Sequence, residues 1–237
     1  ISTQDNETDS YGIFAQGIWS PNDRTDVTIG ARYTYEEKNG TNDGAANGLN
    51  IAEAYTGEDA VNLSKSWNAF TPKLAVNYAL TDDASAYVSV TTGFKSGGYQ
   101  GMAPNPIAAA TPFDEENVTN YEMGVKGTLL DGAMRFGAAA FKSDYSDLQI
   151  LVVDGERLVQ RISNAGEAEI QGLELEGQWL VNDNFQLMAT YAYLDTEYTE
   201  LVGEEENEGN ALRNAPENAY SLSAIFDYPV ATGNLNA

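Results

Sequence analysis

The sequence of 237 residues contains no cysteine and no histidine. Without cysteine, the chain forms no disulfide and has no thiolate to serve as a nucleophile or metal ligand. Without histidine, it lacks the commonest general base and the commonest ligand of transition metals. We therefore assign no catalytic, cofactor-binding or metal-ligating residues, and we expect neither enzymatic activity nor a cofactor.

Basic residues are also scarce, because 12 Lys and Arg stand against 36 Asp and Glu, giving a net charge of -24. Nucleic acid is excluded as a partner, since its phosphates require Lys and Arg. Seven acidic residues crowd one segment: Asp195, Glu197, Glu200, Glu204, Glu205, Glu206 and Glu208. Their oxygen atoms would suit Ca²⁺, but the spacing of an EF-hand is missing, so a solvated acidic loop is favoured.

No apolar run approaches the roughly 18 residues that a membrane helix needs. This does not exclude a membrane protein, because a transmembrane strand needs only about 9–11 residues, of which every second one is apolar. The alternation within a segment therefore carries more information than its mean hydropathy.

Alternation of apolar and polar residues recurs along the chain. In Asn120–Gly127, Tyr121, Met123 and Val125 fall on one face of a strand, and Glu122 and Lys126 fall on the other. The same pattern places together Val27, Ile29, Ala31, Tyr33 and Tyr35, then Leu74, Val76 and Tyr78, then Leu173, Leu175 and Trp179, then Leu187, Ala189, Tyr191 and Tyr193, and finally Leu222, Ala224 and Phe226. The pattern predicts about nine strands and no amphipathic helix longer than two turns.

The predicted connections alternate in length. Segments 20–24, 81–83, 130–132 and 181–184 are rich in turn-forming residues. Long polar segments separate them, at about 39–64, 95–116 and 199–218, and a long hairpin turns at Asp154–Glu156. Short turns at one end and long loops at the other are typical of an outer-membrane barrel, whereas a soluble sandwich mixes loop lengths at both ends. Aromatic residues at predicted strand ends also favour the membrane barrel.

Several short motifs carry a resemblance. They are Phe94–Tyr99, Pro112–Phe113, Glu116–Glu122 with Gly124 and Lys126, Ala139–Gln149, Asn164–Gly166, Gln171–Glu176 and Asn214–Pro216. In this order, across nearly the whole chain from Tyr11 to Tyr228, these motifs resemble the barrel of TonB-dependent outer-membrane receptors. Within that family, the Phe94 motif and the Asn120 motif resemble those of ferric-siderophore receptors.

The resemblance implies an all-β, antiparallel, up-and-down transmembrane barrel in the bacterial outer membrane. It also implies uptake of a large, scarce solute, such as a ferric siderophore, with energy from an inner-membrane complex that acts on an N-terminal plug domain. About nine strands are fewer than the family's barrel has, and residues 232–237 read as a turn. We therefore expect residues 1–237 to be an internal part of one barrel domain, without the plug domain and the closing C-terminal strands.

Two sets of residues are candidates for function. The predicted interior face carries charged residues that would contact one another, the plug or the solute: Arg32, Lys73, Glu122, Lys126, Arg135, Glu174 and Glu176. Glu122 and Lys126, four residues apart on this face, would form a wall pair. Aromatic residues in or beside the predicted outer loops could contact a small-molecule ligand, since such residues often line binding sites: Tyr55, Trp67, Tyr99 and Phe113. A structural role at strand ends or at the membrane interface is the alternative for these four.

The main alternative to a receptor is a barrel-derived structural, assembly or adhesion segment without transport activity. An enzyme, for example a glycosidase with paired carboxylates, is disfavoured because no pair of Asp or Glu residues is placed specifically. The length of the gene upstream of Ile1 would separate the first two hypotheses.

Overall fold

The computed structural model describes residues 2–44, 56–101, 103–154, 159–203, 205–230 and 233–236. Twelve strands, one short α-helix and two 3₁₀ turns are formed within these ranges. The strands are β1 Ser2–Asn22, β2 Thr25–Gly44, β3 Val61–Ala79, β4 Ala84–Lys95, β5 Gly98–Tyr99, β6 Pro112–Phe113, β7 Glu116–Leu129, β8 Met134–Asp154, β9 Val159–Asn182, β10 Phe185–Leu201, β11 Asn218–Val230 and β12 Gly233–Asn236. The helix is α1, Pro106–Ala110, and the 3₁₀ turns are η1 Gly57–Asp59 and η2 Glu205–Asn207.

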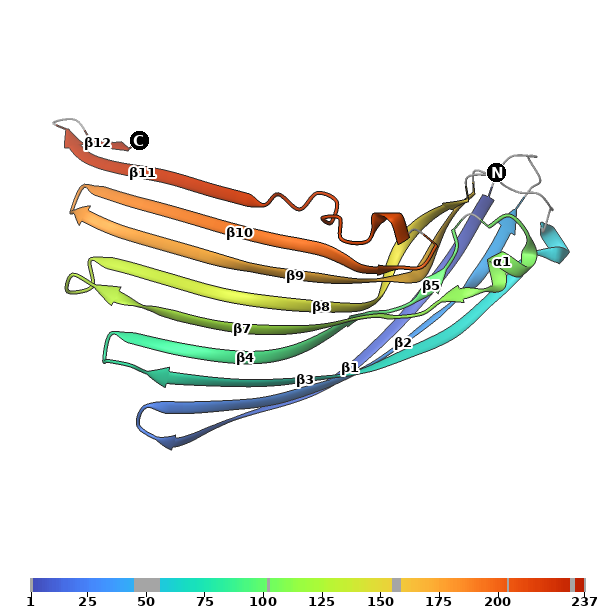
Figure 1. The fold of residues 1–237 in the computed structure, drawn as a ribbon, viewed down its shortest axis with the longest axis horizontal. Helices are drawn as coiled ribbons and strands as arrows, with labels where there is room; N and C mark the ends of the chain where they lie inside the picture. The colour runs from blue at the N-terminus through green and yellow to red at the C-terminus, as the bar shows by residue number, and fades with distance from the viewer. Residues whose placement is uncertain are drawn as a thin grey trace.

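Ten strands form one antiparallel sheet in the order β1-β2-β3-β4-β7-β8-β9-β10-β11-β12. Each strand pairs with the next one of the sheet along the chain, so the topology is up-and-down, as predicted (Figure 1). Nine of these strands are 12 residues or longer in the described part of the chain, in agreement with the predicted nine. The tenth, β12, has four residues.

The connections segregate by length to opposite ends of the strands, which confirms the predicted alternation. Tight turns join β1 to β2, β3 to β4, β7 to β8 and β9 to β10 at one end, on the left in Figure 1. At the β7–β8 turn, Leu130, Asp131 and Gly132 all have positive φ, and the Gly132 N–H donates to the Leu129 carbonyl (3.2 Å). The long connections lie at the other end, where β5, β6 and α1 also lie (Figure 1).

Two segments differ from their predictions, and a third forms a strand that was not predicted. The predicted loop 39–64 is shorter, because β2 and β3 stay paired as far as Asn42 and Val61. The polar run Thr3–Ser10 shows no alternation, yet it pairs with residues 36–43 as the first half of β1. Residues 233–236, predicted to lie in a turn, form β12 against β11. In all three places backbone pairing with a neighbouring strand stabilises the strand, and the side-chain pattern gives no sign of it.

The register separates the side chains of the sheet into two faces, because residues directly opposite each other in an antiparallel pair point to the same side. Ile29, Leu74 and Val90 are opposed in turn across β2, β3 and β4, and Val90 is opposed to Tyr121 on β7. We call their side the apolar face. It also carries Met123, Val125, Leu173, Leu175, Leu187 and Leu222.

The apolar face is open to the surroundings. Ile29 is 61% exposed, Met123 59% and Leu222 76%. A soluble protein rarely exposes so extensive an apolar surface. In the part of the chain that the structure describes, no helix is long and apolar enough to cross a membrane.

Candidate functional site

All seven charged candidates lie on the other side of the sheet, which we call the polar face. Arg32 lies opposite Thr71, two residues from Lys73 on β3. From there the register runs through β4 to Glu122 and Lys126 on β7. Lys126 lies opposite Gly137 of β8, and Gly137 lies opposite Glu176 of β9. Arg135 on β8 and Glu174 on β9 are each two residues further along their strands, so they point to the same side. That this face lines a water-filled interior stays a prediction.

Glu122 and Lys126 do not form the predicted wall pair. Two strand residues four positions apart are separated by roughly 13 Å, at about 3.3 Å per residue, which is too far for direct contact. Glu122 instead accepts a hydrogen bond from the Tyr87 hydroxyl (2.7 Å). The Tyr87 ring lies over Gly124, where an added Cβ would be 2.7 Å from the ring, so only glycine leaves room for it. Within the described residues, none of the seven candidates forms an ion pair.

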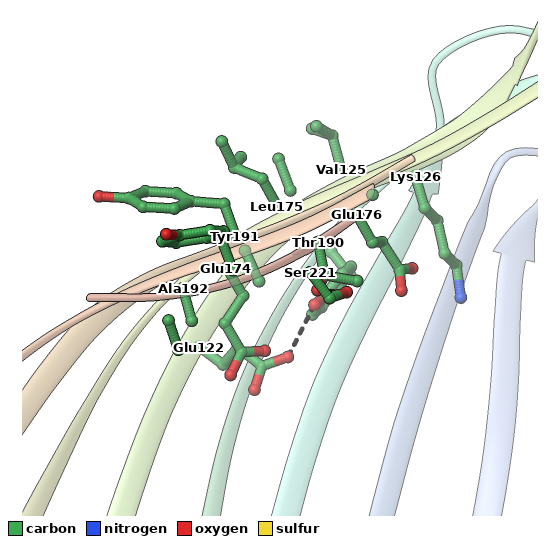
Figure 2. Close-up of a pocket in the computed structure, with 16 residues that line it drawn as sticks. Glu122, Val125, Lys126, Glu174, Leu175, Glu176, Thr190, Tyr191, Ala192 and Ser221 are labelled. Carbon is green, nitrogen blue, oxygen red and sulfur yellow. Dashed lines mark hydrogen bonds between the residues drawn. The ribbon is translucent and has the colours of Figure 1, made fainter. Parts of the chain in front are cut away.

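The polar face contains a hollow of about 560 Å³ between β4 and β11. Glu122, Lys126, Glu174 and Glu176 line it, together with small residues such as Ser221. Figure 2 shows Glu122, Lys126 and Glu176 on the side of the sheet opposite to Val125 and Leu175. Three carboxylates and one ammonium, none of them in an ion pair within the described residues, therefore project into a space that no described part of this chain fills.

At the loop end, one segment crosses the polar face. We call residues 96–101 and 103–114, which include β5, α1 and β6, the strap. Its centre of attachment is Trp67 of β3, which is 2% exposed and makes an edge-to-face contact with Tyr99 (ring centroids 6.2 Å apart). Gly97 lies so close to the indole that an added Cβ would be 2.4 Å from Nε1. The strap therefore packs directly on this side chain.

Two lysines flank the Trp67 ring and also hold the strap. Lys38 and Lys65 lie 5.5 Å and 5.2 Å from the ring centroid, within cation–π range. The Lys38 ammonium donates to the Ser96 hydroxyl (2.9 Å) and the Gly97 carbonyl (2.6 Å). Lys65 pairs with Asp114 (2.6 Å). Both ends of the strap are thus attached to β2 and β3.

Three amide side chains attach the strap to the opposite strands. Gln100 donates to the Ile162 carbonyl (2.6 Å) and accepts from the Ile162 N–H (2.9 Å), as a paired strand would. Asn164 accepts from the Asp114 N–H (2.7 Å) and donates to the Asp114 carbonyl (2.9 Å). Gln149 donates to the carbonyls of Ser96 and Asp114. The strap therefore ties β2 and β3 to β8 and β9, which are not neighbours in the sheet.

Glu36 of β2 also holds the strap, and it lies directly after Tyr35, the last residue of the apolar run on that strand. Its carboxylate accepts a hydrogen bond from Ser96 and lies 3.2 Å from the Lys38 ammonium. Burial by itself would raise the pKa of Glu36, but the hydrogen bonds from Ser96 and Lys38 and the charge of Lys38 bring it below its ordinary value of 4.5. The carboxylate is therefore charged at neutral pH and holds the start of the strap.

A second hollow, of about 860 Å³, lies between the strap and the loop ends of β8 and β9. Ile107 and Phe113 of the strap line one side, and Arg161 and Ser163 of β9 line another. Val202 and Gly203, which follow β10, also line it. The loop end therefore combines a fixed strap with an adjoining open space.

The four aromatic candidates have different outcomes. Tyr55 lies outside the described residues. Trp67, Tyr99 and Phe113 converge on the strap, where Phe113 lies over Gly98 and Trp67 is buried. Phe113 alone of these three also lines the second hollow. A ligand contact by any of the four stays a prediction.

The sequence reasoning missed the residues that attach the strap. Asn164 and Gln149 belong to the motifs Asn164–Gly166 and Ala139–Gln149, so these motifs could have marked them. Lys38 and Gln100 stand in segments without periodicity, and their partners are 58 to 62 residues away in the chain. Only the three-dimensional structure brings these residues together.

A two-faced antiparallel sheet of this length, with turns at one end and loops at the other, defines a segment of a transmembrane β-barrel. The family profile described as "TonB dependent receptor-like, beta-barrel" matches residues 1–237. The chain therefore belongs to the TonB-dependent receptor family. This is a family of non-enzymatic transporters of the bacterial outer membrane, and the chain is part of such a barrel.

Individual relatives agree with this assignment. The pesticin receptor of Yersinia pestis is 29% identical over 178 residues, which are 75% of this chain and 24% of that protein. The metal-pseudopaline receptor CntO of Pseudomonas aeruginosa is 31% identical over 162 residues, 68% of this chain and 21% of that protein. The chain thus spans about a quarter of the length of the curated relatives it matches.

The fold also matches a solved structure. The ferric yersiniabactin uptake receptor FyuA from Yersinia pestis superposes with a TM-score of 0.83 at 23% identity, covering 99% of this chain and 34% of that one. At this identity the likeness supports the fold alone.

Proposed function

We propose that the protein containing this chain takes up a ferric-siderophore-like solute across the outer membrane. The observation that carries the proposal is the strap, because it occupies the polar face at the loop end, where a solute from outside would first meet the barrel. The relatives are named as receptors for pesticin, for metal-pseudopaline and for ferric yersiniabactin. Metal chelates recur among these names, which favours a chelated metal over other solutes.

The proposal also includes a plug domain and energy coupling, and the charges of the polar face are the observation in favour of both. Glu122, Glu174, Glu176 and Lys126 project into the hollow without ion-pair partners among the described residues. Charges in a barrel interior normally pair with neighbours or with water. A plug carrying complementary charges would satisfy them, and a pull on it from the inner-membrane complex would open the path for the solute.

Iron uptake by cells tests this proposal. The full-length gene is expressed in a Gram-negative host that lacks its own ferric-siderophore receptors, and growth under iron limitation is measured with a panel of purified siderophores. We expect at least one siderophore to restore growth and ⁵⁵Fe uptake, and the effect to vanish in a host without the energy-coupling complex. Surface expression without uptake of any panel member would contradict the proposal and favour a structural or adhesion role.

A further inference from the structure

We infer that the second hollow, between the strap and β9, is a binding site for an anionic group carried on an apolar or aromatic body. This inference rests on the proposed function, because it names the chemistry of the part of the solute that enters first. Three features of the hollow carry it: a cation without an ion-pair partner among the described residues, an exposed apolar wall and a frame held by hydrogen bonds.

Arg161 supplies the cation. It is exposed, lines the hollow and forms no ion pair among the described residues. The acidic residue of the lining, Asp114, is neutralised by Lys65 at 2.6 Å. Among the described lining residues, the Arg161 guanidinium is therefore the charge that remains without an ion-pair partner. A guanidinium binds carboxylate, sulfonate or phenolate oxygens well, often through two parallel hydrogen bonds.

Apolar side chains form the other part of the lining. Ile107 of α1 is 80% exposed, and Val202 beyond the end of β10 is 60% exposed. Phe113 and Val152 add further apolar surface. Exposed apolar residues beside the Arg161 guanidinium suit a ligand with an apolar body and an anionic group, and they disfavour a small inorganic anion.

The frame is fixed by hydrogen bonds that do not involve the ligand. Gln100 holds the strap to Ile162, next to Arg161, and Asn164 holds Asp114. A site whose walls are already in place loses less entropy when a ligand binds. The volume of about 860 Å³ falls within the range of small-molecule sites.

Titration calorimetry with two matched probes tests the inference. The full-length receptor in phosphatidylcholine nanodiscs is titrated with naphthalene-1-sulfonate and with 1-naphthalenemethanol, which has the same rings without the charge, and the heat of empty nanodiscs is subtracted. We expect the sulfonate to bind at least about tenfold more tightly than the alcohol, because only the sulfonate can form charged hydrogen bonds with the guanidinium.

Variants then locate the site. Arg161→Gln should weaken sulfonate binding about tenfold and leave the alcohol unchanged, whereas Arg161→Lys should retain most of the sulfonate affinity. Ile107→Ser should weaken both probes. Arg213→Gln is the matched control, because Arg213 is an exposed cation outside the hollow, and it should change neither affinity.

Three outcomes would overturn the inference: no sulfonate binding to the unaltered receptor, sulfonate binding that Arg161→Gln leaves intact, or equal binding of the two probes. The growth assay remains separate, since iron uptake without sulfonate binding rejects only this site, and failed uptake of every siderophore rejects the proposed function.

Discussion

In the middle of the sheet, side chains segregate by face, whereas at the loop end the same strands carry the side chains that fasten the strap. Ile29 and Met123 illustrate the first region, where the apolar face is exposed from strand to strand. Trp67 and Gln100 illustrate the second, where single residues have defined partners. The surroundings of the sheet determine which side chains the first region carries, whereas contacts between particular residues determine those of the second.

The largest effect should come from removing the buried side chain under the strap. Trp67→Ala should destabilise the strap by about 3–5 kcal/mol, the usual cost of truncating a buried aromatic residue. Amide exchange in residues 96–101 and 103–114 should then rise by about a hundredfold or more, since each 1.4 kcal/mol is about tenfold. Hydrogen–deuterium exchange of the full-length receptor measures this.

Trp179→Ala is the control for that variant, because Trp179 lies on β9 and is 40% exposed. It should leave the exchange of the strap unchanged. An equal rise in both variants would mean that the indole of Trp67 does not anchor the strap specifically.

A smaller effect is expected from a charge on the apolar face. Met123→Arg should cost about 2–4 kcal/mol of folding free energy if Met123 lies near the bilayer midplane. Ser89→Arg places the same side chain on the polar face, opposite Glu122, and should cost far less. Urea unfolding of the full-length receptor in lipid vesicles compares the two variants, and equal costs would contradict the assignment of the faces.

The smallest predicted effect is a weaker attachment of the strap at low pH. Because the folded pKa of Glu36 is lowered, its contribution to holding the strap is present in full above its ordinary value of 4.5 and is lost as the pH falls through the lower folded value. Exchange near Ser96 should therefore increase in acid, and Glu36→Gln should show weaker attachment at neutral pH with less dependence on pH. An unchanged pH profile in Glu36→Gln would assign the acid effect to another carboxylate.

The same comparison explains what the sequence could predict. Alternation such as that in Asn120–Gly127 is a local property imposed by a two-sided environment, so it predicted the strands and the shared face of the seven charged candidates. The runs of turn-forming residues, which are also local, predicted that the long loops lie together at one end. The strap depends on contacts such as Lys38 with Gly97 and Gln149 with Ser96, which join segments more than 50 residues apart. The polar half of β1 and the short β12 were missed because backbone pairing stabilises them, and no side-chain pattern marks this.

The most direct test of the two-faced sheet is a pair of spin labels at positions 122 and 123 of the full-length receptor in lipid vesicles, read by their accessibility to oxygen and to a water-soluble nickel complex. If the apolar face contacts lipid, the label at 123 will be accessible mainly to oxygen and the label at 122 mainly to the nickel complex. The reverse pattern would contradict the account, because Tyr121, Met123 and Val125 would then face water.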